Sequence, residues 1–199
     1  MKIVAISDTH GTFPVLPDGD VLVHAGDGTM MGTTKQITEL EDWFSTLNFK
    51  SIIFVPGNHD FICETGYVVK NCTMLLDSGI DIDGVNFWGS PYSPKFGSWA
   101  FMKPDFQLTD VWNKIPNDTD VLITHCPPFD ILDKTVRGIN TGSYTLRYAI
   151  KNRVDAKYHI FGHIHESYGV CCKDNVIYVN ASVVNINYNN TNKPTVINL

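Results

Sequence analysis

Short apolar runs recur along the chain, and a cluster of polar residues follows each of them. The runs are rich in β-branched residues, which is typical of buried strands that lead into loops. We interpret five of them as strands, at residues 2–7, 20–25, 51–55, 121–124 and 158–161.

Two segments change to a helical spacing of apolar positions. Residues 33–48 carry Ile37, Leu40, Phe44 and Leu47 on one face, and Thr33 with Gln36 resembles a capping box. A second helix is predicted after Ser143, with Leu146, Ala149, Ile150 and Val154 on one face. Strands and helices therefore alternate, which is typical of α/β proteins.

The last quarter of the chain lacks helical periodicity. Residues 170–172, 176–179 and 195–197 are candidate strands and favour antiparallel β structure, whereas the Asn-rich residues 185–192 predict an exposed turn. The architecture that we expect is a mixed-sheet sandwich flanked by helices.

Composition agrees with one globular α/β domain, which we assign to residues 1–199. Residues 1–7 lack the features of a signal peptide, and no segment has membrane-spanning length. The five cysteines show no CxxC spacing, so we expect reduced thiols and a cytoplasmic protein. The formal charge of −6 argues against an extended nucleic-acid surface.

Candidate chemistry lies where the predicted strands end. The carboxyl ends of neighbouring strands converge on one edge of an α/β sheet, so we expect the polar clusters to meet there. The clusters supply Asp8, His10, Asp27, Asn58, His125, His163 and His165.

Carboxylate and amide oxygens combined with imidazole nitrogens suit divalent metals such as Mn²⁺, Fe²⁺, Zn²⁺ or Ni²⁺. A single His-X-His pair is also compatible with a structural site. Two ions need further ligands and an anionic group that bridges them, and Asp27 is the natural candidate for that bridge.

The motifs together resemble those of calcineurin-like metallophosphoesterases. They are Asp8-Thr9-His10, Gly26-Asp27, Gly57-Asn58-His59-Asp60, His125 and Gly162-His163-Ile164-His165. Residues 23–27, 124–128 and 161–166 are similar to the branch of small metallophosphoesterase-domain-containing proteins that includes brain-expressed animal phosphodiesterases.

This resemblance implies a four-layer α/β/β/α sandwich, the metallo-dependent phosphatase fold, and two divalent ions. Mn²⁺ is our first expectation, with Fe, Zn, Ni or Co as alternatives. The resemblance also implies that one ion is surrounded by Asp8, His10, Asp27 and His165, and that the other is surrounded by Asp27, Asn58, His125 and His163.

The mechanism that we expect is attack on phosphorus by a hydroxide that bridges the metals. His59 follows a ligand without being needed as one, so it is our candidate for protonating the leaving oxygen, and Asp60 could orient it or support the ligands. His24 and His159 lie inside apolar runs and are expected to be core or supporting histidines. Arg137 and Arg147 are interpreted as solvated.

The choice of substrate rests on departures from protein Ser/Thr phosphatases. Met30 and Met31 stand where an Asp and an Arg are expected, and Asp60 replaces a Glu. Without that arginine a doubly charged monoester has one fewer partner, which favours small, singly charged diesters such as cyclic nucleotides. A phosphomonoesterase or protein phosphatase is the competing enzyme, and a non-catalytic scaffold of the same fold is the competing class.

Overall fold

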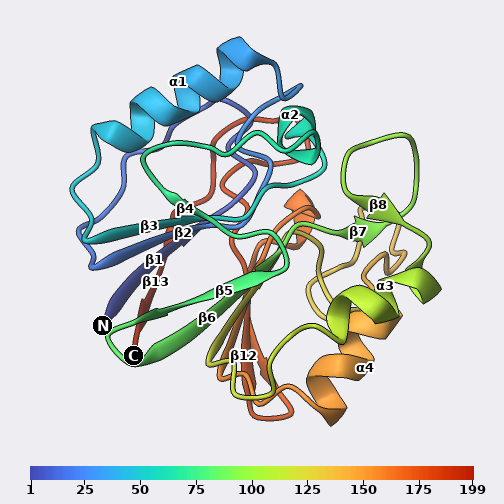
Figure 1. The fold of residues 1–199 in the computed structure, drawn as a ribbon. Coiled ribbons are helices and arrows are strands. Elements are labelled where there is room, and N and C mark those ends of the chain that lie inside the picture. The colour runs from blue at the N-terminus through green and yellow to red at the C-terminus, as the bar shows by residue number, and fades with distance from the viewer.

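Two mixed β-sheets pack face to face in the computed structural model, which describes residues 1–199 (Figure 1). The first sheet has the order β13-β1-β2-β3-β4 and is mostly N-terminal. Its strands are β1 (Lys2–Ile6), β2 (Val21–His24), β3 (Ser51–Phe54), β4 (Thr73–Met74) and β13 (Thr195–Asn198).

The second sheet has the order β11-β12-β10-β9-β6-β5. Its strands are β5 (Ser78–Ile82), β6 (Val85–Ser90), β9 (Val121–Thr124), β10 (Tyr158–Phe161), β11 (Gly169–Lys173) and β12 (Val176–Asn180). A separate short pair consists of β7 (Ser93–Pro94) and β8 (Met102–Lys103).

Helices cover the outer faces of the two sheets. In Figure 1, α1 (Thr34–Ser45) lies over the first sheet, and α3 (Asp105–Trp112) and α4 (Tyr144–Asn152) lie on the far side of the second. Two short helical turns, α2 (Phe61–Glu64) and η1 (His165–Ser167), belong to loops. The expected four-layer sandwich is therefore present.

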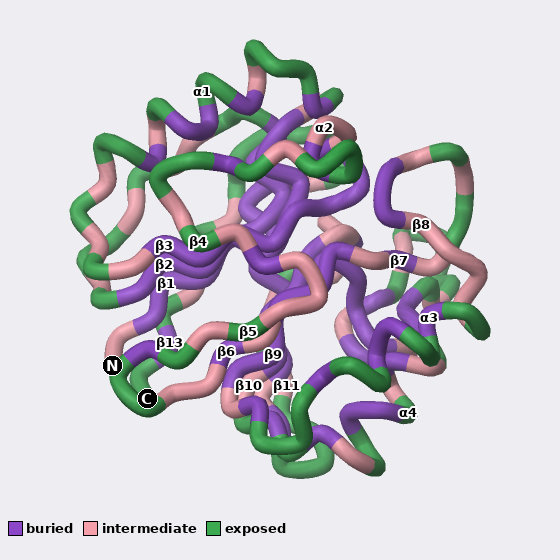
Figure 2. Tube along the Cα trace, viewed as in Figure 1, coloured by how far each residue is buried: buried purple, intermediate pink, exposed green.

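Alternation along the strands builds the layers. In β1, Ile3 and Ala5 pack into the core between the sheets, whereas Val4 and Ile6 pack with Leu40 of α1. The second sheet repeats this pattern toward α3 and α4. The central strands of each sheet are therefore apolar on both faces, and Figure 2 shows them as mostly buried.

Both predicted helix starts are confirmed. Thr33 and Gln36 form a reciprocal capping box at α1. The Ser143 hydroxyl accepts a hydrogen bond from the backbone N–H of Leu146 at α4. Both helices end earlier than the apolar pattern suggested, and Val154 is buried just beyond α4.

The C-terminal strands are only partly antiparallel. β11 pairs antiparallel with β12, and β13 pairs antiparallel with β1, as expected. However, β12 also pairs in parallel with β10, because the chain crosses back before β12. The elements of residues 61–112 were not anticipated.

Strand direction sets the position of the polar clusters. β1, β2 and β3 are parallel in the first sheet, and β9 and β10 are parallel in the second. A backbone bridge joins the two sheets where β1 ends: Ser7 N–H donates to Ala181 O at 2.9 Å, and Val183 N–H donates to Ser7 O at 3.0 Å.

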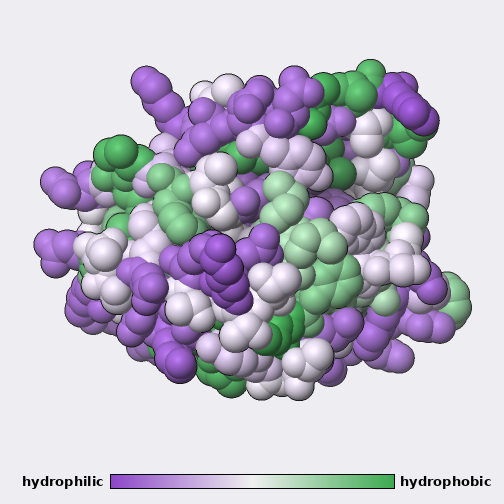
Figure 3. Space-filling view, turned by 90° about the horizontal axis from the view of Figure 1, so that it is seen from above, coloured by the Kyte–Doolittle hydropathy of each residue, from purple (hydrophilic) through white to green (hydrophobic).

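The surface shows no large apolar face in the view from above (Figure 3), where hydrophobic residues form small groups among hydrophilic ones. None of the helices combines the length and the apolarity needed to cross a membrane.

Candidate metal centre

The seven predicted ligands lie in loops that directly follow β1, β2, β3, β9 and β10. Four of them adopt a left-handed backbone although they are not glycine: Asp8 (φ 55°), His10 (φ 45°), Asp27 (φ 55°) and His163 (φ 71°). Such conformations cost free energy and cluster at functional sites. The strand ends are thus bent to turn these side chains toward one point.

Glycines precede the ligands because the loops touch one another there. A Cβ atom at Gly57 would fall within 3.0 Å of the Asp27 carboxylate and of the His125 ring. A Cβ atom at Gly162 would likewise collide with the side chains of Ser7 and Asp8. Close approach therefore explains the Gly-Asn and Gly-His pairs of the motifs.

Two triads of donor atoms result from this convergence. Each consists of atoms that all lie within 4.8 Å of one another. The triads are Asp8, His10 and His165, and Asp27, His125 and His163. A third such group, which shares members with both, is His10, Asp27 and His59.

In the first triad, His165 Nε2 lies 3.4 Å from Asp8 Oδ1 and 3.3 Å from His10 Nε2. The Asp8 carboxylate also accepts hydrogen bonds from Ser7 Oγ at 2.5 Å and from the backbone N–H of His163. These bonds fix the carboxylate, so its remaining lone pairs can serve a cation.

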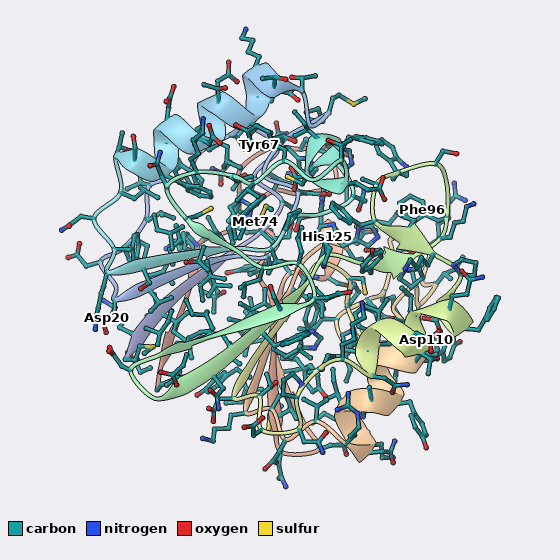
Figure 4. All side chains as sticks on the ribbon, viewed as in Figure 1. Asp20, Tyr67, Met74, Phe96, Asp110 and His125 are labelled. Carbon is teal, nitrogen blue, oxygen red and sulfur yellow. The ribbon has the colours of Figure 1, made fainter.

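In the second triad, His125 Nε2 lies 3.3 Å from Asp27 Oδ2 and 3.2 Å from His163 Nδ1. Asn58 Oδ1 is 3.0 Å from His125 Nε2. Asp27 Oδ2 is also 3.9 Å from His10 Nε2, so this carboxylate stands between the triads. Figure 4 shows His125 where the two sheets converge.

Backbone carbonyls identify the nitrogens that are free for metal. His125 Nδ1 lies 2.9 Å from Ala25 O, and His165 Nδ1 lies 3.2 Å from Asn185 O. An N–H at each Nδ1 would donate to the carbonyl, which leaves each Nε2 with a lone pair that faces other acceptors. Acceptors that face one another need a cation between them, so the donor set fits divalent metal ions.

Charge at the site points the same way. Burial opposes ionisation of Asp8 and Asp27, but His165 and His125 respectively hold the pKa of each carboxyl well below its usual range. Burial also opposes charge on His125, yet Asp27 raises the pKa of that imidazole to about 9. The two buried carboxylates therefore stabilise positive charge beside them.

His59 lies beside the triads. Its Nδ1 is 2.6 Å from Met30 O, its backbone N–H donates to Asp27 Oδ1 at 2.8 Å, and its Nε2 is 4.0 Å from Asp27 Oδ2. The carbonyl of Met30 thus aims the other ring nitrogen at the centre. A role for the backbone of Met30 could not be predicted from the sequence.

Asp60 is fully buried, and its carboxylate pairs with backbone and hydroxyl groups and not with the His59 ring. Its carboxylate accepts hydrogen bonds from the N–H groups of Gly57 at 2.8 Å, Gly28 at 3.2 Å and Thr29 at 2.9 Å. Burial raises its pKa to about 6, and the charge of Asp27 adds to this. Asp60 therefore ties the loop after β3 to the loop after β2, which is a supporting position.

The two histidines assigned to the core are confirmed as buried and outside the triads. His24 Nε2 pairs with Thr9 Oγ1 at 2.9 Å, and His159 Nε2 pairs with Thr124 Oγ1 at 2.7 Å. Arg137 is exposed, as predicted. The prediction that Arg147 is solvated is wrong, because its side chain is only 15% exposed and pairs with Asp174 away from the centre.

Residues that the sequence did not single out surround the centre. Phe96, Trp99, Val136, Glu166, Ile186 and Tyr188 complete the lining of an open cleft above Asp27, Asn58, His59, His163 and His165. Glu166 directly follows His165 in the segment 161–166, but the others come from loops that carry no local motif, so the sequence held no signal for them. The Asn-rich turn supplies two of them and also the carbonyl of Asn185 that holds His165.

Known proteins are similar in sequence to this chain. The calcineurin-like phosphoesterase family model matches residues 1–167, a segment that contains every proposed ligand. The chain is 35% identical along its whole length to metallophosphoesterase domain-containing protein 1 of Homo sapiens and of Mus musculus, and it covers 71% of each. It is 36% identical to a UPF0046 protein of Caenorhabditis elegans over 93% of the chain and 70% of that relative. The chain therefore belongs to the calcineurin-like phosphoesterase family.

Proposed function

We propose that the protein is a dinuclear metal-dependent phosphodiesterase that hydrolyses small phosphodiesters such as cyclic nucleotides. The family makes it a metal-dependent phosphoesterase. The preference for diesters is inferred from the cleft.

One observation carries this preference: no lysine or arginine lines the cleft, although candidate metal donors converge there. A monoester dianion carries one more negative charge than a diester and gains more from a cationic side chain. Met31, one of the two residues at the positions of the missing Asp and Arg, is 52% exposed and does not line the cleft. The absence of a lysine or arginine side chain from this lining therefore favours the singly charged ester.

Each of the two ions would be held by its own set of residues, with one carboxylate in common. Asp8, His10 and His165 would hold one ion, and Asn58, His125 and His163 would hold the other, with Asp27 shared between them. Two bound ions would supply an activated water and polarise a phosphoryl oxygen. All the donors are oxygen or imidazole nitrogen, and none is a thiolate, so Mn²⁺ is the ion that we propose first.

His59 is proposed to donate a proton to the leaving oxygen. Its ring is held by Met30 O, and that bond is compatible with a second proton on Nε2, which faces the centre. Asp60 is proposed to position the loop that carries Asn58 and His59, through the N–H bonds that it accepts.

The test is an assay of Mn²⁺-reconstituted protein against bis(p-nitrophenyl) phosphate, p-nitrophenyl phosphate, and 2′,3′- and 3′,5′-cyclic AMP. We expect kcat/KM to be higher for the diester than for the monoester. Faster turnover of the monoester would refute the diesterase proposal and leave a phosphomonoesterase. Repeating the assay with Fe²⁺, Zn²⁺, Ni²⁺ and Co²⁺ ranks the metals.

The acid role of His59 is tested by leaving groups. A p-nitrophenolate leaves without help, whereas the ribose oxygen of a cyclic nucleotide needs a proton. His59→Ala should therefore slow cyclic nucleotide hydrolysis about 100-fold and bis(p-nitrophenyl) phosphate hydrolysis much less. Equal slowing of both substrates, with the metal content unchanged, would contradict the role.

A further inference from the structure

One loop places two aromatic side chains over the metal centre. Residues 95–101 connect β7 and β8, and the Phe96 ring lies 5.4 Å from the His163 ring. The Trp99 ring stacks on His59 at 4.4 Å with an interplanar angle of 30°. Phe96 is 62% exposed, and Figure 4 shows it in this loop, outside the packed layers.

Tyr188 reaches the centre from the Asn-rich turn. Its ring lies 4.7 Å from the ring of His10 and 5.2 Å from that of His165, in edge contacts. It remains 41% exposed. The two loops therefore bring three aromatic rings to the mouth of one cleft.

Tyr188 is held there at a cost. Its φ of 60° is left-handed, a conformation that suits glycine or asparagine and is uncommon for a bulky side chain. The turn is closed by hydrogen bonds from the N–H of Tyr188 to Asn185 O at 2.8 Å and from the N–H of Asn185 to Asn189 O at 2.9 Å. Strain that is maintained beside a reactive centre is a reason to look for function.

We propose that Phe96, Trp99 and Tyr188 form an aromatic rim that binds a planar ring carried by the substrate's ester group, either a nucleobase or an aryl group. This inference rests on the proposed function for its phosphoester. Phe96 and Tyr188 lie against candidate ligand histidines, and Trp99 lies against the proposed acid His59. A planar group stacked on the open sides of these rings would lie next to the phosphoryl site.

The rest of the lining agrees with a ring rather than an anion. Val136 and Ile186 extend the apolar part of the cleft, and they are 69% and 49% exposed. The lining also contains the carboxylate of Glu166, which accepts a hydrogen bond from the backbone N–H of Val136 at 2.8 Å. An aromatic surface left in water gains free energy when it stacks on a base, and such stacking is tolerant of base identity.

The experiment compares three monoester ligands of equal charge on Mn²⁺-reconstituted protein by isothermal titration calorimetry. The probes are methyl phosphate, phenyl phosphate and thymidine 5′-monophosphate. We expect a ring to tighten binding by about fivefold or more relative to methyl phosphate. Tighter binding of the nucleotide than of phenyl phosphate assigns a nucleobase, and equal binding assigns an aryl group.

Variants test the residues. Tyr188→Asn removes the ring with a residue that tolerates the left-handed conformation, so the turn should be preserved, and Trp99→Leu removes the second ring. Each should bring the ratio of affinities, ring-bearing probe to methyl phosphate, toward one. Tyr188→Phe should keep the ratio, because it keeps the ring.

The matched control is Phe106→Leu, which alters a phenylalanine that is 73% exposed on α3 and outside the cleft. Its affinity ratio should equal that of the unaltered protein. A ratio near one in the unaltered protein, or a ratio that survives both Tyr188→Asn and Trp99→Leu, overturns the rim. The binding data stand apart from turnover, so a monoester preference would refute the proposed diesterase without touching this result.

Discussion

The two sheets bring different donor atoms to the centre. Loops of the first sheet supply Asp8, Asp27 and Asn58, which are all the oxygen donors, together with His10. Loops of the second sheet supply only imidazoles, from His125, His163 and His165. Each triad nevertheless takes members from both sheets, so neither sheet contains a metal site by itself.

This division explains why the centre is buried between the layers. Carboxylates and imidazoles approach from opposite sheets, and their mutual attraction is part of the packing of one sheet on the other. We expect changes at the centre to alter the contact between sheets, and changes elsewhere in either sheet to leave the centre intact.

The largest effect should come from Asp27→Ala, because Asp27 lies between the triads. We expect both ions to be lost or weakened and kcat/KM to fall by at least about 100-fold, measured by an assay with bis(p-nitrophenyl) phosphate and by elemental analysis. The control is Asp120→Ala, which removes a carboxylate that pairs with Lys157 just before the starts of β9 and β10. Unchanged metal content in Asp27→Ala would argue against the shared carboxylate.

The second prediction concerns which residues share an ion. Asp8 and His165 lie in loops of different sheets, but Asp8→Ala and His165→Ala should each remove the same ion and leave about one ion per chain. The double variant should lose little more metal than either single variant. Asp8→Ala combined with His125→Ala should instead lose both ions. If the losses followed the sheet of origin and not the triad, the proposed pairing would be wrong.

A smaller effect concerns the pH dependence of stability, in which the two core histidines should differ. Burial lowers the pKa of His159 to about 3, from an ordinary value of 6.5. The neutral form is favoured by folding, so this contribution to stability is complete above pH 6.5 and is lost as the pH falls toward 3.

His159→Gln should therefore lose less stability than the unaltered protein between pH 7 and pH 4.5, by about 2 kcal/mol. Urea unfolding at both pH values measures the difference. His24, whose pKa burial also lowers to about 3, lies near the charges of Asp8 and Asp27, and its variant should in addition disturb metal binding. If the difference in unfolding free energy between His159→Gln and the unaltered protein were the same at both pH values, the effect would be excluded for His159.

The smallest effect concerns the helix caps on the two outer layers. Thr33→Ala should destabilise the protein by about 0.5–1 kcal/mol, and Ser143→Ala by about 1–2 kcal/mol. Ser143 has the larger value because its hydroxyl also donates to Asp105 at 2.6 Å. Thermal unfolding measures both, and kcat should stay unchanged in each. A greater loss at Thr33 would contradict the assigned hydrogen bonds.

The layers and the ligand positions could be predicted from the sequence because each depends on local order. An apolar run followed by Asp, Asn or His encodes both a buried strand and the residue at its end, and the glycines mark the close approach of loops. The central strands β1, β2, β3, β9 and β10 were accordingly found.

The remainder depends on contacts between distant parts of the chain. β4, β7 and β8 have two residues each, and β5 is partly exposed with a glycine as its second residue, so their apolar patterns are weak. The parallel pairing of β12 with β10 is a matter of topology. Trp99 and Tyr188 reach the centre only because their loops are folded over it.

The bridge at Ser7 has a consequence for the motions of the cleft. Its two hydrogen bonds join the strand that precedes Asp8 to residues 181–183, which lead into the turn that carries Tyr188. Sheets that slide apart must break both bonds, so opening there is a rare thermal event and the amide protons of Ser7 and Val183 should exchange slowly with solvent. Ions held between residues as distant in sequence as Asp8 and His165 act as reversible cross-links and should slow that exchange further. Hydrogen exchange at these two amides therefore measures how strongly the two sheets are held together, and the measurement needs no substrate.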